Sequence, residues 1–120
     1  MEDRRRSYRL NAWLHAYYRI AGSEQPFNAM TRNVGAGGVA LLTERRLECG
    51  TPLQVEVKFS DREPITFTAA VAWSEALIRP GMGDQPRAFE TGLRFVDITP
   101  ENRKQILLFT VLSPPPSTIK

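Results

Sequence analysis

The stretch LQVEVKF, residues 53–59, alternates strictly between apolar and polar side chains. Successive side chains of a β-strand point to opposite faces of a sheet, so a period of two indicates a strand with one buried face. That face would carry every second residue of the stretch, namely Leu53, Val55, Val57 and Phe59. The stretch therefore predicts a sheet that covers a core on one side and meets water on the other.

Similar alternation, or a short apolar run, recurs on both sides of this stretch. Turn-rich segments containing Gly, Pro, Ser or Asp separate these runs. The additional strands are predicted over residues 10–19, 27–34, 39–43, 65–73 and 88–96. Six short strands with a turn every 8–12 residues or so are typical of an antiparallel β-barrel.

The period of the pattern changes near the C-terminus. Thr99 is a good N-cap, and Pro100 suits the first position of a helix over residues 100–112. The apolar residues on one face of this helix would be Ile106, Phe109 and Leu112. The predicted fold class is therefore mainly all-β, a small six-stranded antiparallel β-barrel with a C-terminal α-helix.

Length and charge limit the possible functions. At 120 residues, the chain has room for one domain with a single hydrophobic core. Its net charge of +3 comes mainly from arginine, because the only lysines are Lys58, Lys104 and Lys120. The planar guanidinium suits phosphate and guanine edges, which favours a phosphate-bearing partner. The 13 acidic residues, in contrast, disfavour a broad nucleic-acid-binding face.

Cysteine usage and hydropathy bear on location. Cys49 is the only cysteine, so no disulfide can form within the chain, and a reducing compartment is favoured. No apolar run approaches the roughly 20 residues of a membrane-spanning helix. Asn11, His15 and Arg19 interrupt the residues after the basic N-terminus, which disfavours a signal peptide. We expect a cytoplasmic protein without a membrane span.

Residues suited to catalysis or metal binding are sparse. His15 lies in a predicted strand without a nucleophile or carboxylate in clear register, and Cys49 has no second metal ligand nearby. The GAGG run at 35–38 is not followed by a helix, as a dinucleotide-binding fingerprint requires. We therefore expect no enzymatic activity, no metal site and no cofactor.

The N-terminal run MEDRRRSYRL places four arginines, Arg4, Arg5, Arg6 and Arg9, ahead of the first apolar segment. Like charges repel, and clustered guanidinium groups seldom stabilise a fold. On these residues alone, two interpretations remain open. The cluster is either a solvated terminal tail or a site for an anionic partner.

The second unusual stretch is NVGAGG at residues 33–38, with three glycines in four positions. Glycine permits tight turns and also lets a ligand approach the main chain closely. Taken alone, the stretch favours a tight turn or bulge. A hairpin turn needs only one or two such residues, however, so an additional role is indicated.

Together, the two stretches resemble the signature of the PilZ family, bacterial β-barrel domains that bind the second messenger cyclic di-GMP. The RxxxR motif of the family matches residues 5–9, and its [D/N]xSxxG motif matches residues 33–38 except at the serine position. VAW at 71–73 and TGLRF at 91–95 also fit the family pattern. The resemblance covers about residues 4 to 112. It implies a flexible arginine-rich segment at 1–9, a barrel with its helix at 10–112 and a tail at 113–120.

The resemblance also implies a binding site. Arg5 and Arg9 would hold a phosphate and the Hoogsteen edge of a guanine, and Asn33 would bind another guanine edge. Gly38 would keep the backbone clear for the base. Arg4 occupies the position that, in the family, accompanies capture of an intercalated ligand dimer.

Three further positions qualify this site. Trp73 would be its aromatic wall, although a tryptophan of the barrel core fits the sequence equally well. Gly35 stands where the family has serine, which removes a hydroxyl hydrogen bond worth about 0.5–1.5 kcal/mol. Asn33 replaces the commoner aspartate, and an amide is the weaker acceptor for guanine. We expect cyclic di-GMP to bind, with reduced affinity.

The leading hypothesis is a receptor that binds cyclic di-GMP and relays the signal to an unidentified effector protein, in control of motility, biofilm or polysaccharide. The alternative is a PilZ-fold interaction module whose nucleotide binding is weakened or lost. A DNA- or RNA-binding barrel using the outward Trp13 and Tyr17 is a third possibility. The modest net charge disfavours it, and no nucleic-acid partner is expected.

Overall fold

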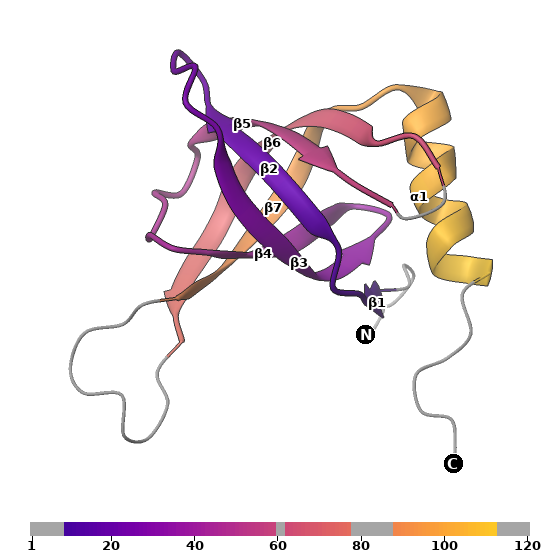
Figure 1. The fold of residues 1–120 in the computed structure, drawn as a ribbon, viewed down its shortest axis with the longest axis horizontal. Coiled ribbons are helices and arrows are strands. Elements are labelled where there is room, and N and C mark those ends of the chain that lie inside the picture. Colours follow the sequence, from indigo (N-terminus) through magenta and orange to yellow (C-terminus); the bar gives the residue numbers. More distant parts are fainter. Residues whose placement is uncertain (1–8, 60–61, 78–87, 113–120) are drawn as a thin grey trace.

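The computed structural model describes residues 9–59, 62–77 and 88–112 (Figure 1). Arg4 and Arg5 lie outside these ranges, and so does the predicted tail at 113–120. The side chains of residues 9, 10 and 110–112 are likewise outside the description, so only their backbone is considered.

Seven strand segments and one helix make up the described chain. They are β1 (Arg9–Asn11), β2 (His15–Ile20), β3 (Phe27–Gly35), β4 (Gly38–Thr43), β5 (Pro52–Val57), β6 (Ile65–Ala76), β7 (Phe89–Asp97) and α1 (Pro100–Leu112). The strands pair in the order β1-β3-β2-β5-β6-β7-β4, all antiparallel, and β4 also pairs with β3. The β3–β4 pairing closes β2 to β7 into a six-stranded barrel (Figure 1). The predicted fold class is confirmed.

Alternating side chains build the core as the sequence predicts. Leu53, Val55 and Val57 of β5 are almost fully buried, and Phe59 just beyond the strand is buried as well. Tyr18 stacks on Phe27 inside the barrel, with ring centroids 5.2 Å apart. Burial of these apolar side chains supplies most of the favourable free energy of folding.

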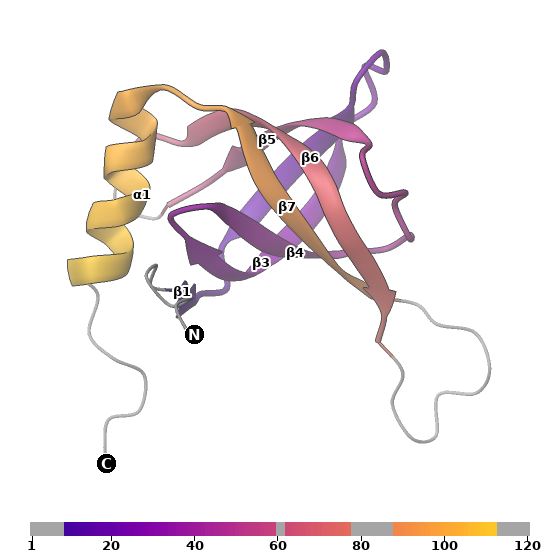
Figure 2. The same cartoon turned by 180° about the vertical axis from the view of Figure 1, so that it is seen from behind.

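The helix begins and packs as predicted. The backbone N–H of Asn102 donates to Thr99 Oγ1 at 3.1 Å, which is the expected N-cap bond. Ile106 is buried in the core, and Phe109 packs edge-on against Phe59 at a centroid distance of 4.9 Å. Figure 2 shows α1 standing beside the barrel, where it contacts β3 and β6. No helix in the described ranges is both long enough and apolar enough to cross a membrane.

The prediction of one continuous strand over 10–19 was wrong. The chain leaves the ladder at 12–14, so that β1 and β2 are separate strands that both pair with β3. Between the pairs Asn11↔Asn33 and His15↔Met30, three residues of the N-terminal strand face two residues of β3. The extra residue cannot enter a regular ladder, and it therefore interrupts the strand.

Candidate functional site

The short strand β1 joins the two sequence motifs. It runs antiparallel to the end of β3, with Arg9 opposite Gly35 and Asn11 opposite Asn33. The last arginine of RxxxR is thus held by backbone pairing against the first glycine of NVGAGG. The chain leading back to Arg5 and Arg4 starts at this point.

A depression of about 420 Å³ lies on the barrel surface beside this junction. Asn33, Gly38 and Trp73 line it, so three of the predicted site residues meet there although they come from β3, β4 and β6. Gly35 belongs to the same strand as Asn33 but does not line the depression.

Two β-bulges direct side chains into the depression. In β3, the register shifts between Thr31 and Asn33, so that Arg32 is the extra residue just before Asn33. In β6, the register shifts between Val71 and Trp73, and two consecutive residues, Ala72 and Trp73, are therefore exposed. A bulge commonly re-aims a side chain in this way.

Trp73 belongs to the surface, so the alternative of a core tryptophan was wrong. Its side chain is 41% exposed. The indole lies flat enough on β7 that a Cβ added to Gly92 would come within 2.3 Å of Trp73 Cε2. The indole of Trp73 therefore packs directly on Gly92, which leaves room for it because it has no side chain. An aromatic ring beside an open depression can stack on a base.

The glycines of NVGAGG form a tight turn, because β3 ends at Gly35 and β4 begins at Gly38. In the described chain, positive φ angles occur at Gly22 and Gly50, so left-handed backbone is not the reason for the glycines of this turn. Gly38 has another requirement. A Cβ there would lie 1.9 Å from the carbonyl oxygen of Leu93, which shows how closely β4 approaches β7.

The sequence interpretation missed Arg94. This exposed residue of β7 pairs with Gly38 in the ladder and lines the depression together with Asn33 and Trp73. It brings a guanidinium group to the wall of the depression. Alternation in TGLRF already places Arg94 on the outer face, but only the pairing of β4 with β7 places it beside Gly38.

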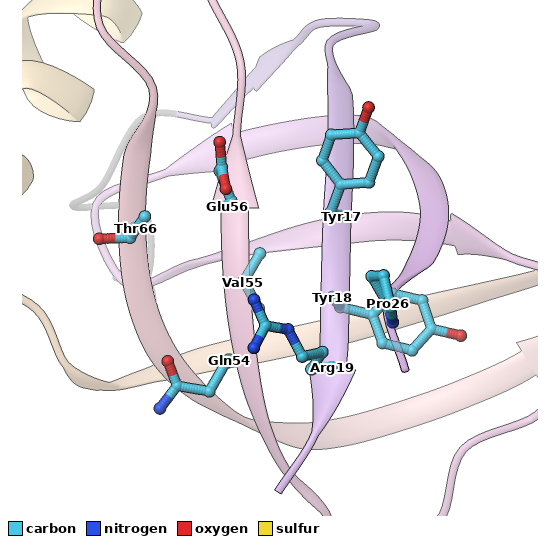
Figure 3. A pocket seen from close by; sticks show the side chains of 8 residues that line it. All are labelled: Tyr17, Tyr18, Arg19, Pro26, Gln54, Val55, Glu56 and Thr66. Carbon is cyan, nitrogen blue, oxygen red and sulfur yellow. The ribbon is translucent and has the colours of Figure 1, made fainter. Parts of the chain in front are cut away.

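A second depression, of about 280 Å³, lies elsewhere on the barrel and contains none of the predicted site residues. Figure 3 shows Tyr17 and Arg19 projecting from β2 and Gln54 and Glu56 from β5 around it. Tyr18 also contributes to its lining, and burial raises the pKa of this phenol above its ordinary value. Within the described ranges, no three His, Cys, Asp or Glu side chains gather in a way that could hold a metal ion.

The sequence pattern of the PilZ domain family matches residues 3–111. The chain belongs to the PilZ family. The match includes Arg4, Arg5 and the whole described barrel, so the predicted membership of the PilZ family is confirmed. No curated protein matches this PilZ chain by sequence.

Solved structures share the fold of this PilZ chain. The PilZ domain of YcgR from Escherichia coli with c-di-GMP superposes with a TM-score of 0.73 at 18% identity, covering 91% of this chain and 90% of that one. MotI/DgrA, an inhibitor of motility from Bacillus subtilis, gives 0.73 at 17% identity, covering 92% and 51%. The K. pneumonia MrkH–c-di-GMP complex gives 0.70 at 17% identity, covering 93% and 54%. The chain thus spans about half the length of MotI/DgrA and MrkH.

Proposed function

We propose that this PilZ chain is a receptor that binds cyclic di-GMP and passes the signal to a protein partner. The observation that carries the proposal is the pairing of Arg9 with Gly35 beside the depression that Asn33, Gly38 and Trp73 line. This arrangement brings the arginine segment to a surface that has an amide, bare backbone and an aromatic ring. The presence of c-di-GMP in the structures of YcgR and MrkH supports the same ligand.

The proposed contacts follow from the chemistry of the ligand. Cyclic di-GMP carries two phosphates and two guanines, and arginine binds both phosphate oxygens and the O6 and N7 acceptors of guanine. Arg5 and Arg9 would hold a phosphate and a Hoogsteen edge. Asn33 would bind a second guanine edge, and Trp73 would stack on a base.

Arg94 adds a cation that the two motifs do not contain. It lines the depression from β7, opposite Gly38 of β4. A charge-assisted bond from a guanidinium is stronger than the neutral hydroxyl bond that is lost at Gly35. We infer that Arg94 offsets much of the effect of the missing serine.

The signal would arise from ordering of the arginine segment. Arg4, Arg5 and Arg6 repel one another until bound phosphates neutralise them, and the segment would then fold over the nucleotide against the barrel. The surface formed in this way would recruit or release the effector in the cytoplasm. Motility is the process that the name of MotI/DgrA, an inhibitor of motility, favours.

Isothermal titration calorimetry with cyclic di-GMP tests the proposal. We expect the wild-type chain to bind cyclic di-GMP and Arg94→Ala to lose at least tenfold in affinity, about 1.4 kcal/mol. The control Arg19→Ala, at an exposed arginine of β2 away from the depression, should not change the affinity. Loss of binding on Arg5→Ala with Arg9→Ala is also expected. No heat from folded wild-type protein at high micromolar ligand would refute the receptor.

The second candidate is a PilZ-fold interaction module with little or no nucleotide binding, which Gly35 favours because the serine hydroxyl is missing. The combined Arg5→Ala and Arg9→Ala variant separates the two functions. A receptor should lose cyclic di-GMP in this variant. A module should have no nucleotide affinity to lose and should hold its protein partner as the wild type does.

The stoichiometry of the same titration tests the role of Arg4. An intercalated dimer requires two nucleotides per chain, and Arg4→Ala should reduce this number to one. A wild-type ratio of one nucleotide per chain would contradict the assignment of Arg4.

A further inference from the structure

The junction between β1 and β2 is held from inside the barrel by one hydroxyl group. Thr31 of β3 is fully buried, at 0% exposure. Its Oγ1 accepts a hydrogen bond from the backbone N–H of Leu14 at 2.9 Å and donates one to the backbone carbonyl of Ala12. One side chain thus bonds both ends of the three-residue break in the N-terminal strand.

These bonds replace a ladder that cannot form. Residues 12–14 face only two residues of β3, so regular cross-strand pairing fails there. Backbone bonds flank the break, from Ala12 N–H to the Arg32 carbonyl at 3.1 Å and from Thr31 N–H to the Leu14 carbonyl at 2.8 Å. Between these two bonds, the Thr31 hydroxyl satisfies both the Leu14 N–H and the Ala12 carbonyl, because a hydroxyl can accept and donate at the same time.

The next residue of the same bulge holds the junction from outside. The guanidinium of Arg32 lies 5.6 Å from the ring centroid of Trp13 and 3.6 Å from a carboxylate oxygen of Glu90 on β7. Trp13 is 59% exposed, so burial alone does not fix its position. Two consecutive residues of the β3 bulge therefore hold the 12–14 junction. Thr31 contacts it from the inside of the barrel and Arg32 from the outside.

We propose that Thr31 is a positioning residue for the nucleotide site. It anchors the 12–14 junction so that β1 stays paired with β3 and Arg9 stays opposite Gly35. This inference rests on the proposed function, because the benefit of holding Arg9 is the affinity for cyclic di-GMP. The end of the arginine segment nearest the barrel is anchored in this way, and the entropy of ordering that end is lost before the ligand arrives.

The expected effect follows from a population argument. If β1 is docked in only a fraction of molecules, the apparent dissociation constant rises in inverse proportion to that fraction. Thr31→Val keeps the shape of the side chain and removes both hydroxyl bonds. A docked fraction near one tenth would weaken binding about tenfold, or ~1.4 kcal/mol.

The matched control is Thr43→Val. Thr43 is a buried threonine of β4 whose hydroxyl donates to the Arg45 carbonyl at 2.8 Å and pairs with Thr91 Oγ1 at 3.0 Å. It lies at the opposite end of β4 from Gly38, and the partners of its hydroxyl, Arg45 and Thr91, do not belong to the 12–14 junction. The control therefore removes a similar buried hydroxyl without touching β1, and Thr31→Ser restores the hydroxyl at the test position.

The experiment combines amide hydrogen exchange by NMR on the ligand-free chain with calorimetry. In Thr31→Val, we expect exchange at residues 9–14 to accelerate, above all at the Leu14 amide, while core amides keep the protection seen in Thr43→Val. Affinity for cyclic di-GMP should fall about tenfold relative to Thr43→Val and recover in Thr31→Ser.

Unchanged exchange at residues 9–14 in Thr31→Val would overturn the anchor. So would an affinity equal to that of Thr43→Val, or a Thr31→Ser variant as weak as Thr31→Val. The exchange measurement needs no nucleotide. Failure of the wild type to bind cyclic di-GMP would thus refute the proposed function, and faster exchange at residues 9–14 would still support the anchor.

Discussion

Substitution of Gly38 by alanine tests whether the close packing of β4 against β7 requires glycine at this position, independently of any ligand. The added Cβ would lie 1.9 Å from the Leu93 carbonyl oxygen and 3.1 Å from Arg94 Cα. Real Cβ contacts are essentially never shorter than 3.0 Å, so β4 and β7 would have to separate by about 3.0 − 1.9 = 1.1 Å. The obstacle is backbone, which no change of rotamer can move aside.

The energetic consequence is large for a domain of this size. A separation of 1.1 Å takes neighbouring ladder bonds from about 2.9 Å to about 4 Å, beyond hydrogen-bond range. Loss of one or two such bonds, together with the overpacking itself, costs about 3 kcal/mol. This corresponds to a fall in melting temperature of about 10 °C.

Gly37→Ala is the matched control in the same turn. A Cβ at Gly37 meets nothing within 4 Å, and the φ angle is not in the left-handed region. Alanine has less conformational freedom than glycine in the unfolded chain. Gly37→Ala should therefore be as stable as the wild type, or more stable by about 0.4–1 kcal/mol.

Thermal unfolding followed by circular dichroism compares Gly38→Ala with Gly37→Ala in the absence of ligand. If the two variants melt together, the close approach of β4 and β7 does not constrain Gly38 and the reasoning fails. If only Gly38→Ala is destabilised, the close approach of β4 and β7 is the reason for this glycine, independently of any ligand contact.

Three further substitutions test other parts of the structure. Gly92→Ala places a Cβ 2.3 Å from Trp73 Cε2, and the exposed indole should therefore move away. This would shift tryptophan fluorescence and weaken cyclic di-GMP binding with little loss of stability. An unchanged fluorescence spectrum would contradict the packing of Trp73 on Gly92. Gly35→Ser should raise affinity up to about tenfold in calorimetry by restoring the hydroxyl, and weaker binding would count against that contact. Burial raises the pKa of Tyr18. The folded state therefore holds this proton longer than the unfolded state, so stability is full below the ordinary tyrosine pKa of about 10 and is lost as pH rises through the folded value. Urea unfolding from about pH 9 to about pH 11 should show a smaller decline in Tyr18→Phe, and equal declines would refute the assignment.

The local patterns of the sequence determined the elements and the family. Alternation in 53–59 predicted which side chains of β5 and the residues after it are buried, and Thr99 predicted the start of α1. The predicted strands that became β3 to β7 agree with the structure to within about three residues at each end. These features depend on neighbours along the chain, which a linear pattern records.

Tertiary pairing decided how the site is assembled. The break at 12–14, the bulges at Arg32 and Ala72 and the position of Arg94 beside Gly38 all depend on register between segments distant in sequence. The hydrophobic period of a strand says which face is buried but not which residue lies opposite. A bulge that shifts the pairing by one residue turns a side chain outward, and the hydrophobic pattern of the strand does not reveal where this happens. For this reason the sequence left Trp73 undecided between core and surface, and the bulge after Val71 placed it on the wall of the candidate site.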